Sequence, residues 1–208
     1  MSLTRLAEAE RRDLADLLAD LTLEEWNAPS LCAGWRVRDV VAHMFSYEEL
    51  SALQIAGLFV LGRFNVDRIN ELALAPIRDM SPALLVATAN THITPRGLTA
   101  GFGGGIALTD GMIHQQDIRR PLHRPRTIPD ERVRAALGVA LRSPTLGARR
   151  VRHRLRLVAT DLDWGTGTGL EVRGPAEALL MCLAGRRDAM TDCSGPGMAE
   201  LRSRLSAA

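Results

Sequence analysis

Apolar residues recur at helical spacing through the first two thirds of the chain. The first stripe runs from Leu6 to Leu21 and predicts an amphipathic helix, because residues three and four apart share one helical face. A second stripe starts at Val37 and predicts a long helix to about Leu61, with the apolar run 55–62 at its buried end. Further helices are expected at residues 65–74, 81–92, 109–120 and 133–141.

After Pro144 the apolar period changes from helical to two. Along Arg150–Val158, arginines alternate with mostly apolar residues, which predicts a strand with one buried and one solvated face. The alternating arginines could instead bind an anion or nucleic acid, but the absence of interleaved aromatic residues favours the solvated face. A short strand at 170–172 and a helix at 178–183 follow. The fold class is therefore mainly α, with a helical domain at 1–142 and a smaller α/β domain at 145–208.

Composition adds limits to this picture. The 208 residues are 46% hydrophobic and 24% charged, as in an ordinary globular protein. All 26 basic residues are arginines, and against 24 acidic residues they leave a net charge of only +2, so we expect no nucleic-acid or membrane partner. The N-terminus lacks the pattern of a signal peptide, so we expect a cytoplasmic protein. Three cysteines are too few and too scattered for a disulfide framework or a closed zinc knot.

One helix carries the candidate chemistry. Asp110, His114 and Asp117 fall within a narrow arc of its surface, and Ile113 and Ile118 flank that arc, so the polar stripe points inward. Burying two carboxylates and an imidazole without partners costs several kcal/mol, in order of magnitude. A divalent cation is the simplest compensation, but ligands on one helix do not complete a site.

His43, on the flank of the second helix, is the candidate for the missing ligand. A lone histidine in such a place is more often a hydrogen-bonded core residue. If the two helices are neighbours in a bundle, however, His43, Asp110 and His114 provide three ligands and leave an open position, the pattern of a catalytic zinc site. Asp117 is then either a partner that orients His114 or an alternative acidic ligand.

Several segments in this order resemble one family. Trp26–His43 and His114–Leu122 are similar to the two signatures of the DinB-like, mycothiol-dependent maleylpyruvate isomerase family, and residues 174–186 and 194–197 are similar to its C-terminal tail. The resemblance implies a DinB-like four-helix bundle that binds a divalent metal, usually zinc, through His43, Asp110 and His114. The sequence departs from the family pattern at Asp110, where glutamate is expected, and at Arg36, where a serine or threonine cap is expected.

The resemblance also implies a function. Zinc with an open position holds a low-molecular-weight thiol, here mycothiol, as the nucleophilic thiolate, which adds to a small electrophile. The result is isomerisation of the maleylpyruvate type or S-transfer. Gln116 and Arg119 are candidates to hold the carboxylate or sugar hydroxyls of these ligands. The chain would act as a monomer or homodimer.

Two other functions remain open at this point. A DinB-fold protein could bind a metal or small molecule without catalysis, since bundle cores also carry His–Asp pairs for structural reasons. A metal-dependent hydrolase could use the same three ligands. It is disfavoured because no residue other than Asp117 is a candidate for the general base.

Overall fold

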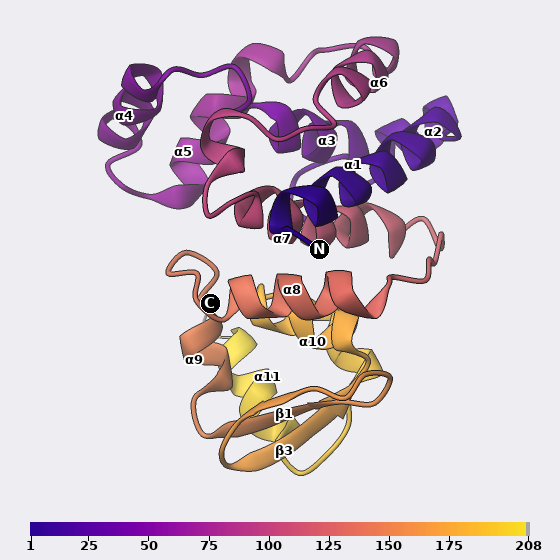
Figure 1. Cartoon of the computed structure of the whole chain (residues 1–208), viewed down its shortest axis with the longest axis vertical. Helices are drawn as coiled ribbons and strands as arrows, with labels where there is room; N and C mark the ends of the chain where they lie inside the picture. The colour runs from indigo at the N-terminus through magenta and orange to yellow at the C-terminus, as the bar shows by residue number, and fades with distance from the viewer. Residues whose placement is uncertain (207–208) are drawn as a thin grey trace. The chain divides into compact units, whose positions relative to one another are not determined.

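The computed structural model describes residues 1–206 and divides the chain into two compact units, Met1–Pro125 and the part from Arg126 onward (Figure 1). The first unit is helical. Its elements are α1 (Leu3–Ala19), α2 (Leu23–Asn27), α3 (Val37–Phe45), α4 (Ala52–Leu61), α5 (Val66–Leu74), η1 (Ala75–Ile77), α6 (Pro82–Thr91), η2 (Gly97–Ala100) and α7 (Gly105–Arg119).

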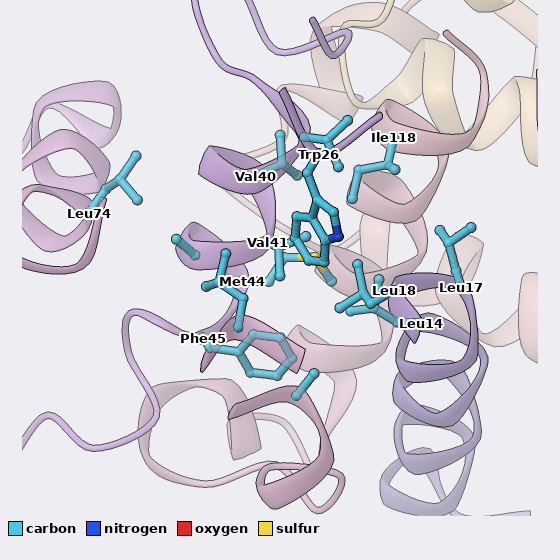
Figure 2. Close-up of a cluster of buried hydrophobic side chains, with 14 residues drawn as sticks. Leu14, Leu17, Leu18, Trp26, Val40, Val41, Met44, Phe45, Leu74 and Ile118 are labelled. Atoms are coloured by element: carbon cyan, nitrogen blue, oxygen red, sulfur yellow. The ribbon is translucent and has the colours of Figure 1, made fainter. Parts of the chain in front are cut away.

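Four of these helices form the expected bundle. α1 and α3 each pack against both α6 and α7, which closes a four-membered arrangement. Large apolar side chains from these helices and from α2 fill the space between them, as Figure 2 shows for Leu14, Trp26, Val41 and Ile118. The mainly α fold predicted from the helical period and the helical bundle implied by the family resemblance are therefore confirmed.

The prediction of one long second helix is wrong, because α3 ends at Phe45 and a separate helix follows. The Ser46 hydroxyl donates to the carbonyl of His43 at the end of α3, and Ser51 opens α4 with a capping box to Gln54. The expected burial of the run 55–62 is also wrong. α4 has no buried residue, and Leu53 and Val60 are 83% and 68% exposed.

Several predicted helix ends agree with the structure, and others differ from it. The helices expected at 65–74 and 81–92 are α5 and α6, which Asn65 and Ser81 cap, and α7 ends at Arg119. The first helix ends at Ala19, two residues before the end of its predicted stripe, and a capping box at Thr22 starts the separate helix α2. Among residues 1–206, no single helix is long and apolar enough to cross a membrane, and only the bent pair Val66–Ile77 and Pro82–Thr91 reaches that length and composition together.

The second unit combines helices with a three-stranded sheet. Its elements are α8 (Asp130–Ala140), α9 (Ala148–Arg152), β1 (Leu155–Ala159), β2 (Gly165–Gly167), β3 (Leu170–Gly174), α10 (Ala176–Leu183), η3 (Asp188–Asp192) and α11 (Met198–Ser206). The strand order is β2-β1-β3, with β1 antiparallel to β2 and parallel to β3. The division between the units falls earlier than the expected boundary at residue 142, because α8 packs against α10.

The predicted strand Arg150–Val158 is only partly correct. Its first residues form the helix α9, and Arg154 turns the chain with a φ of 55° before β1 begins. On β1, Leu155 and Leu157 are buried and Arg156 is exposed, so alternation starts only there. The short apolar period was visible in the sequence, but the helix that precedes it was not.

Candidate metal centre

The structure brings the three predicted ligands together. His43 lies on α3, Asp110 and His114 lie on α7, and these two helices pack against each other. One possible ligand atom from each of the three side chains lies within 4.8 Å of the others. The rings of His43 and His114 are 5.0 Å apart between centroids and nearly perpendicular, at 85°. The helices are thus neighbours as the three-ligand hypothesis requires, while metal binding itself stays a prediction.

The two carboxylates of the stripe lie on opposite edges of the His114 ring. Nδ1 is 2.8 Å from Asp117 Oδ2, whereas Nε2 is 3.4 Å from Asp110 Oδ1. These partners indicate that Nδ1 carries a proton shared with Asp117, which leaves Nε2 on the side of Asp110 and His43. The geometry therefore favours Asp110 as the acidic ligand and Asp117 as the residue that orients His114.

The electrostatics of the cluster favour a cation. Burial disfavours the charged form of His114, but the charge of Asp110 and hydrogen bonds to Asp110 and Asp117 raise the pKa of His114 well above its usual value. Desolvation also disfavours the Asp110 carboxylate, but the positive charge of His114 and then of His43 lowers its pKa. The Asp110 side chain is 36% exposed, so solvent reaches the cluster on that side.

Two aromatic side chains hold His43 in place. Its ring centroid lies 5.0 Å from that of Trp35 and 6.1 Å from that of Tyr47. The Tyr47 hydroxyl donates to Asn70 Oδ1 at 2.8 Å. Burial, together with the charge of Asp110, raises the pKa of Tyr47 to about 12, so the hydroxyl keeps its proton at neutral pH. Tyr47 therefore acts as a neutral wall of the site.

Sequence reasoning missed Cys32. Its Sγ lies 3.2 Å from Asp117 Oδ2 and 3.7 Å from His114 Nδ1. The cysteines were weighed only as a disulfide or zinc framework, so a single thiol beside a carboxylate was not considered. The available signal was its place in the compact loop directly before the helix that carries His43.

The family model described as the mycothiol maleylpyruvate isomerase N-terminal domain matches residues 7–95. This match to the N-terminal part of the chain supports the family resemblance seen in the sequence. The match includes Cys32 and His43 and ends before Asp110 and His114.

A solved structure related to this family has the same fold. A histidine-to-alanine mutant of a mycothiol-dependent maleylpyruvate isomerase superposes with a TM-score of 0.55 at 15% identity, covering 93% of this chain and 91% of that one. Another structure of the mycothiol-dependent maleylpyruvate isomerase gives a TM-score of 0.44 at 13% identity, with 88% of each chain covered. None of the curated proteins matches this sequence.

Gln116 and Arg119, which were predicted to hold the carboxylate or sugar hydroxyls of ligands, lie away from the three clustered side chains. Arg119 donates from Nε to Gln115 Oε1 at 3.1 Å and from Nη2 to the Asp13 carbonyl at 3.3 Å, which ties α7 to α1. Gln116 is buried, and two positions along a helix place it about 200° around the axis from His114. Both residues therefore lie on other faces of α7.

Proposed function

We propose that this chain is a metal-dependent, thiol-activating enzyme that uses mycothiol to act on a small electrophile. The observation that carries the proposal is the grouping of His43, Asp110 and His114, with His114 Nδ1 held by Asp117. The match of residues 7–95 to the mycothiol maleylpyruvate isomerase N-terminal domain supports mycothiol as the thiol. The product is either an isomer or a mycothiol S-conjugate.

The residues present fit a divalent metal. Two imidazole nitrogens and one carboxylate oxygen are a ligand set that Zn²⁺ accepts, and three protein ligands leave a position for an incoming group. A cation bound there would supply the positive charge that keeps a thiol deprotonated at neutral pH. The proximity of the three side chains in a buried setting is the physical support for this fit.

The side chains around the ligands have separate tasks. Asp117 orients His114 through Nδ1, while Trp35 and Tyr47 restrict the His43 ring. The partly exposed Asp110 marks the side from which thiol and electrophile approach. Addition of the thiolate to the electrophile, followed by bond rotation and loss of the thiol, gives isomerisation, whereas a stable adduct gives S-transfer.

The hydrolase alternative loses support from the geometry. It would need Asp117 as the general base that activates water. The Asp117 side chain is fully buried, and its Oδ2 already lies within hydrogen-bonding distance of His114 and Cys32. A carboxylate enclosed in this way is suited to holding a ring and poorly placed to take a proton from water.

Elemental analysis of protein purified without chelator tests the metal. We expect about one divalent ion per wild-type chain and its loss in His43→Ala and His114→Ala. His92→Ala is the matched control, because His92 is also buried but is held by the Thr88 carbonyl outside the cluster. Wild-type protein without stoichiometric metal would contradict the proposal.

Calorimetric titration with mycothiol tests the thiol. Binding should be seen with metal-replete protein and should be lost with metal-free protein and with His114→Ala. A chain that binds metal but not mycothiol would instead be a metal-binding protein without this activity.

A further inference from the structure

The loop at residues 29–35, between α2 and α3, contacts both histidines of the candidate centre. Trp35 packs on the ring of His43, and Cys32 lies beside His114 and Asp117. The same short segment thus reaches one ligand on α3 and another on α7. This arrangement suggests that the loop has a task at the centre beyond joining two helices.

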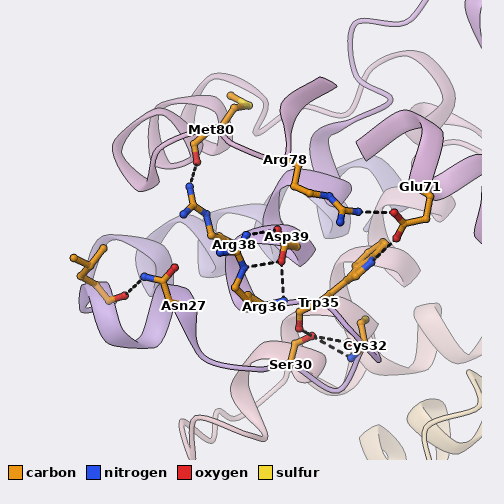
Figure 3. A network of polar contacts seen from close by, with 11 residues as sticks. Asn27, Ser30, Cys32, Trp35, Arg36, Arg38, Asp39, Glu71, Arg78 and Met80 are labelled. Carbon is orange, nitrogen blue, oxygen red and sulfur yellow. Dashed lines mark hydrogen bonds and ion pairs between the residues drawn. The ribbon is translucent and has the colours of Figure 1, made fainter. Parts of the chain in front are cut away.

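Hydrogen bonds fix the loop internally and against α7. Ser30 Oγ donates to the Trp35 carbonyl at 2.9 Å and accepts from the Cys32 N–H at 3.1 Å, as Figure 3 shows. The N–H of Leu31 donates to the Asp117 carbonyl at 3.0 Å. Cys32 is therefore held next to Asp117 by the main chain as well as by its own side chain.

The Asp117 carboxylate receives two side-chain contacts at one oxygen. His114 Nδ1 lies 2.8 Å and Cys32 Sγ 3.2 Å from Oδ2. A carboxylate is only an acceptor, so the thiol must be the donor. Because a buried carboxylate needs its hydrogen bonds satisfied, the second donor restricts rotation of the group that in turn restricts His114.

We propose that Cys32 is a positioning residue for the metal centre, acting through Asp117 on His114. The inference rests on the proposed metal-dependent function and adds a role for a residue outside the ligand set. Its thiol donates to Asp117, Asp117 holds Nδ1 of His114, and Nε2 of that ring stays directed toward Asp110 and His43. This series of contacts runs from the loop to the ligand.

Zn²⁺ affinity of the full-length chain, measured by competition with a chelating dye, tests this role. Partners that orient metal ligands typically change metal affinity about 10- to 100-fold, so Asp117→Asn should weaken binding by that factor. Cys32→Ala removes one hydrogen bond and should weaken binding roughly 3- to 10-fold. Cys32→Ser keeps a donor and should restore most of the loss. Cys193→Ala is the control and should leave affinity unchanged, because Cys193 belongs to the second unit, where its thiol donates to the Ala189 carbonyl at 3.5 Å.

The double variant separates positioning from general destabilisation. If Cys32 acts only through Asp117, Cys32→Ala in the Asp117→Asn background should cause no further loss, whereas independent effects would multiply. Multiplying effects, or Cys32→Ala with wild-type affinity, would overturn the proposal while leaving the metal function intact. A wild-type chain that binds no metal would overturn both.

Cobalt substitution tests whether the Cys32 thiol binds the metal directly. Cys32, His114 and Asp117 could themselves surround a metal, since their ligand atoms also lie within 4.8 Å of one another. A thiolate ligand gives Co²⁺ an intense near-ultraviolet charge-transfer band. We expect no such band, and a change in the visible ligand-field bands of Cys32→Ala that Cys32→Ser reverses. A charge-transfer band that disappears in Cys32→Ser would make Cys32 a ligand and overturn the positioning role.

Discussion

At the scale of single residues, Arg11 of α1 is a buried charge with several partners. Its guanidinium donates to Glu48, to the hydroxyl of Thr99 and to the carbonyl of His92. The side chains of Arg11 and Glu48 are 4% and 0% exposed. These contacts join α1 to the segments that follow α3 and α6. Removing one member leaves the other charge buried without its main partner.

Arg11→Met should therefore lower the free energy of unfolding by about 3–5 kcal/mol, the usual effect of breaking a buried ion pair. Arg12→Met is the matched control at the next position, because Arg12 is 58% exposed and pairs with Glu8 only at 3.6 Å. This change should stay within about 0.5 kcal/mol. Urea unfolding followed by circular dichroism measures both. Equal effects of the two variants would show that the buried network contributes little.

The candidate site shows which residues a sequence can and cannot reveal. Asp110, His114 and Asp117 were placed on one face by the helical period alone, and the structure agrees. The approach of His43 needed a bundle in which α3 and α7 are neighbours, and the family resemblance supplied that. Cys32 could not be placed at the centre, because a loop has no period and its hydrogen bond to Asp117, 85 positions away, forms only on folding.

At the scale of elements, the start of α3 resolves a conflict in the sequence. Two arginines in a helical first turn oppose the macrodipole. In the structure, Arg36 folds back so that its guanidinium donates to both oxygens of Asp39, and its backbone N–H donates to Asp39 Oδ2 at 2.9 Å (Figure 3). Arg38 points to the carbonyl of Met80 instead. Asp39 thus supplies the acidic half of a capping box, because it accepts from the backbone N–H at the N-cap, while the Arg36 side chain makes no cap hydrogen bond of its own.

Asp39→Asn should destabilise the protein by about 1–2 kcal/mol at pH 7, because it weakens a cap and a charged hydrogen bond. Burial opposes the Asp39 charge, but Arg36 outweighs it and lowers the pKa of Asp39. A lowered folded-state pKa gives stability above the unfolded value of about 3.9 and loses it as pH falls further. The difference between wild type and variant should therefore shrink below about pH 4.

Urea unfolding at pH 7 and pH 3 measures this dependence. Asp67→Asn is the control, since Asp67 lies in the first turn of α5, where Asn65 already provides the cap. Its effect should remain under about 1 kcal/mol. An Asp39→Asn difference that is the same at both pH values would contradict a role for the Asp39 charge.

The helix α4 shows why a hydrophobic pattern can mislead at this scale. Its sequence is apolar on all sides, so the period selects no buried face, and burial was inferred from hydrophobicity alone. The break before it was recoverable, because Ser51 and Gln54 stand at the spacing of a capping box. The prediction followed the continuous apolar stripe and therefore overlooked this capping box.

At the scale of the whole molecule, the predicted ligands come from distant parts of the chain but from only one of its two units. His43, Asp110 and His114 all lie within Met1–Pro125, as do Cys32 and Asp117. A metal that binds them in the folded state and not in the unfolded chain must stabilise this unit as a whole. Thermal unfolding can therefore report on the centre without any assay of activity.

Adding Zn²⁺ at about 100 times its dissociation constant should stabilise the folded chain by about 2.7 kcal/mol. For a chain of this size, that corresponds to a rise in Tm of roughly 5–10 °C, which chelator should reverse. His43→Ala should abolish the rise. His92→Gln should lower the starting Tm but keep the rise, because His92 lies outside the ligand cluster. If calorimetry resolves separate transitions for the two units, only that of residues 1–125 should move. A rise that persists in His43→Ala, or one confined to the second unit, would place the metal elsewhere.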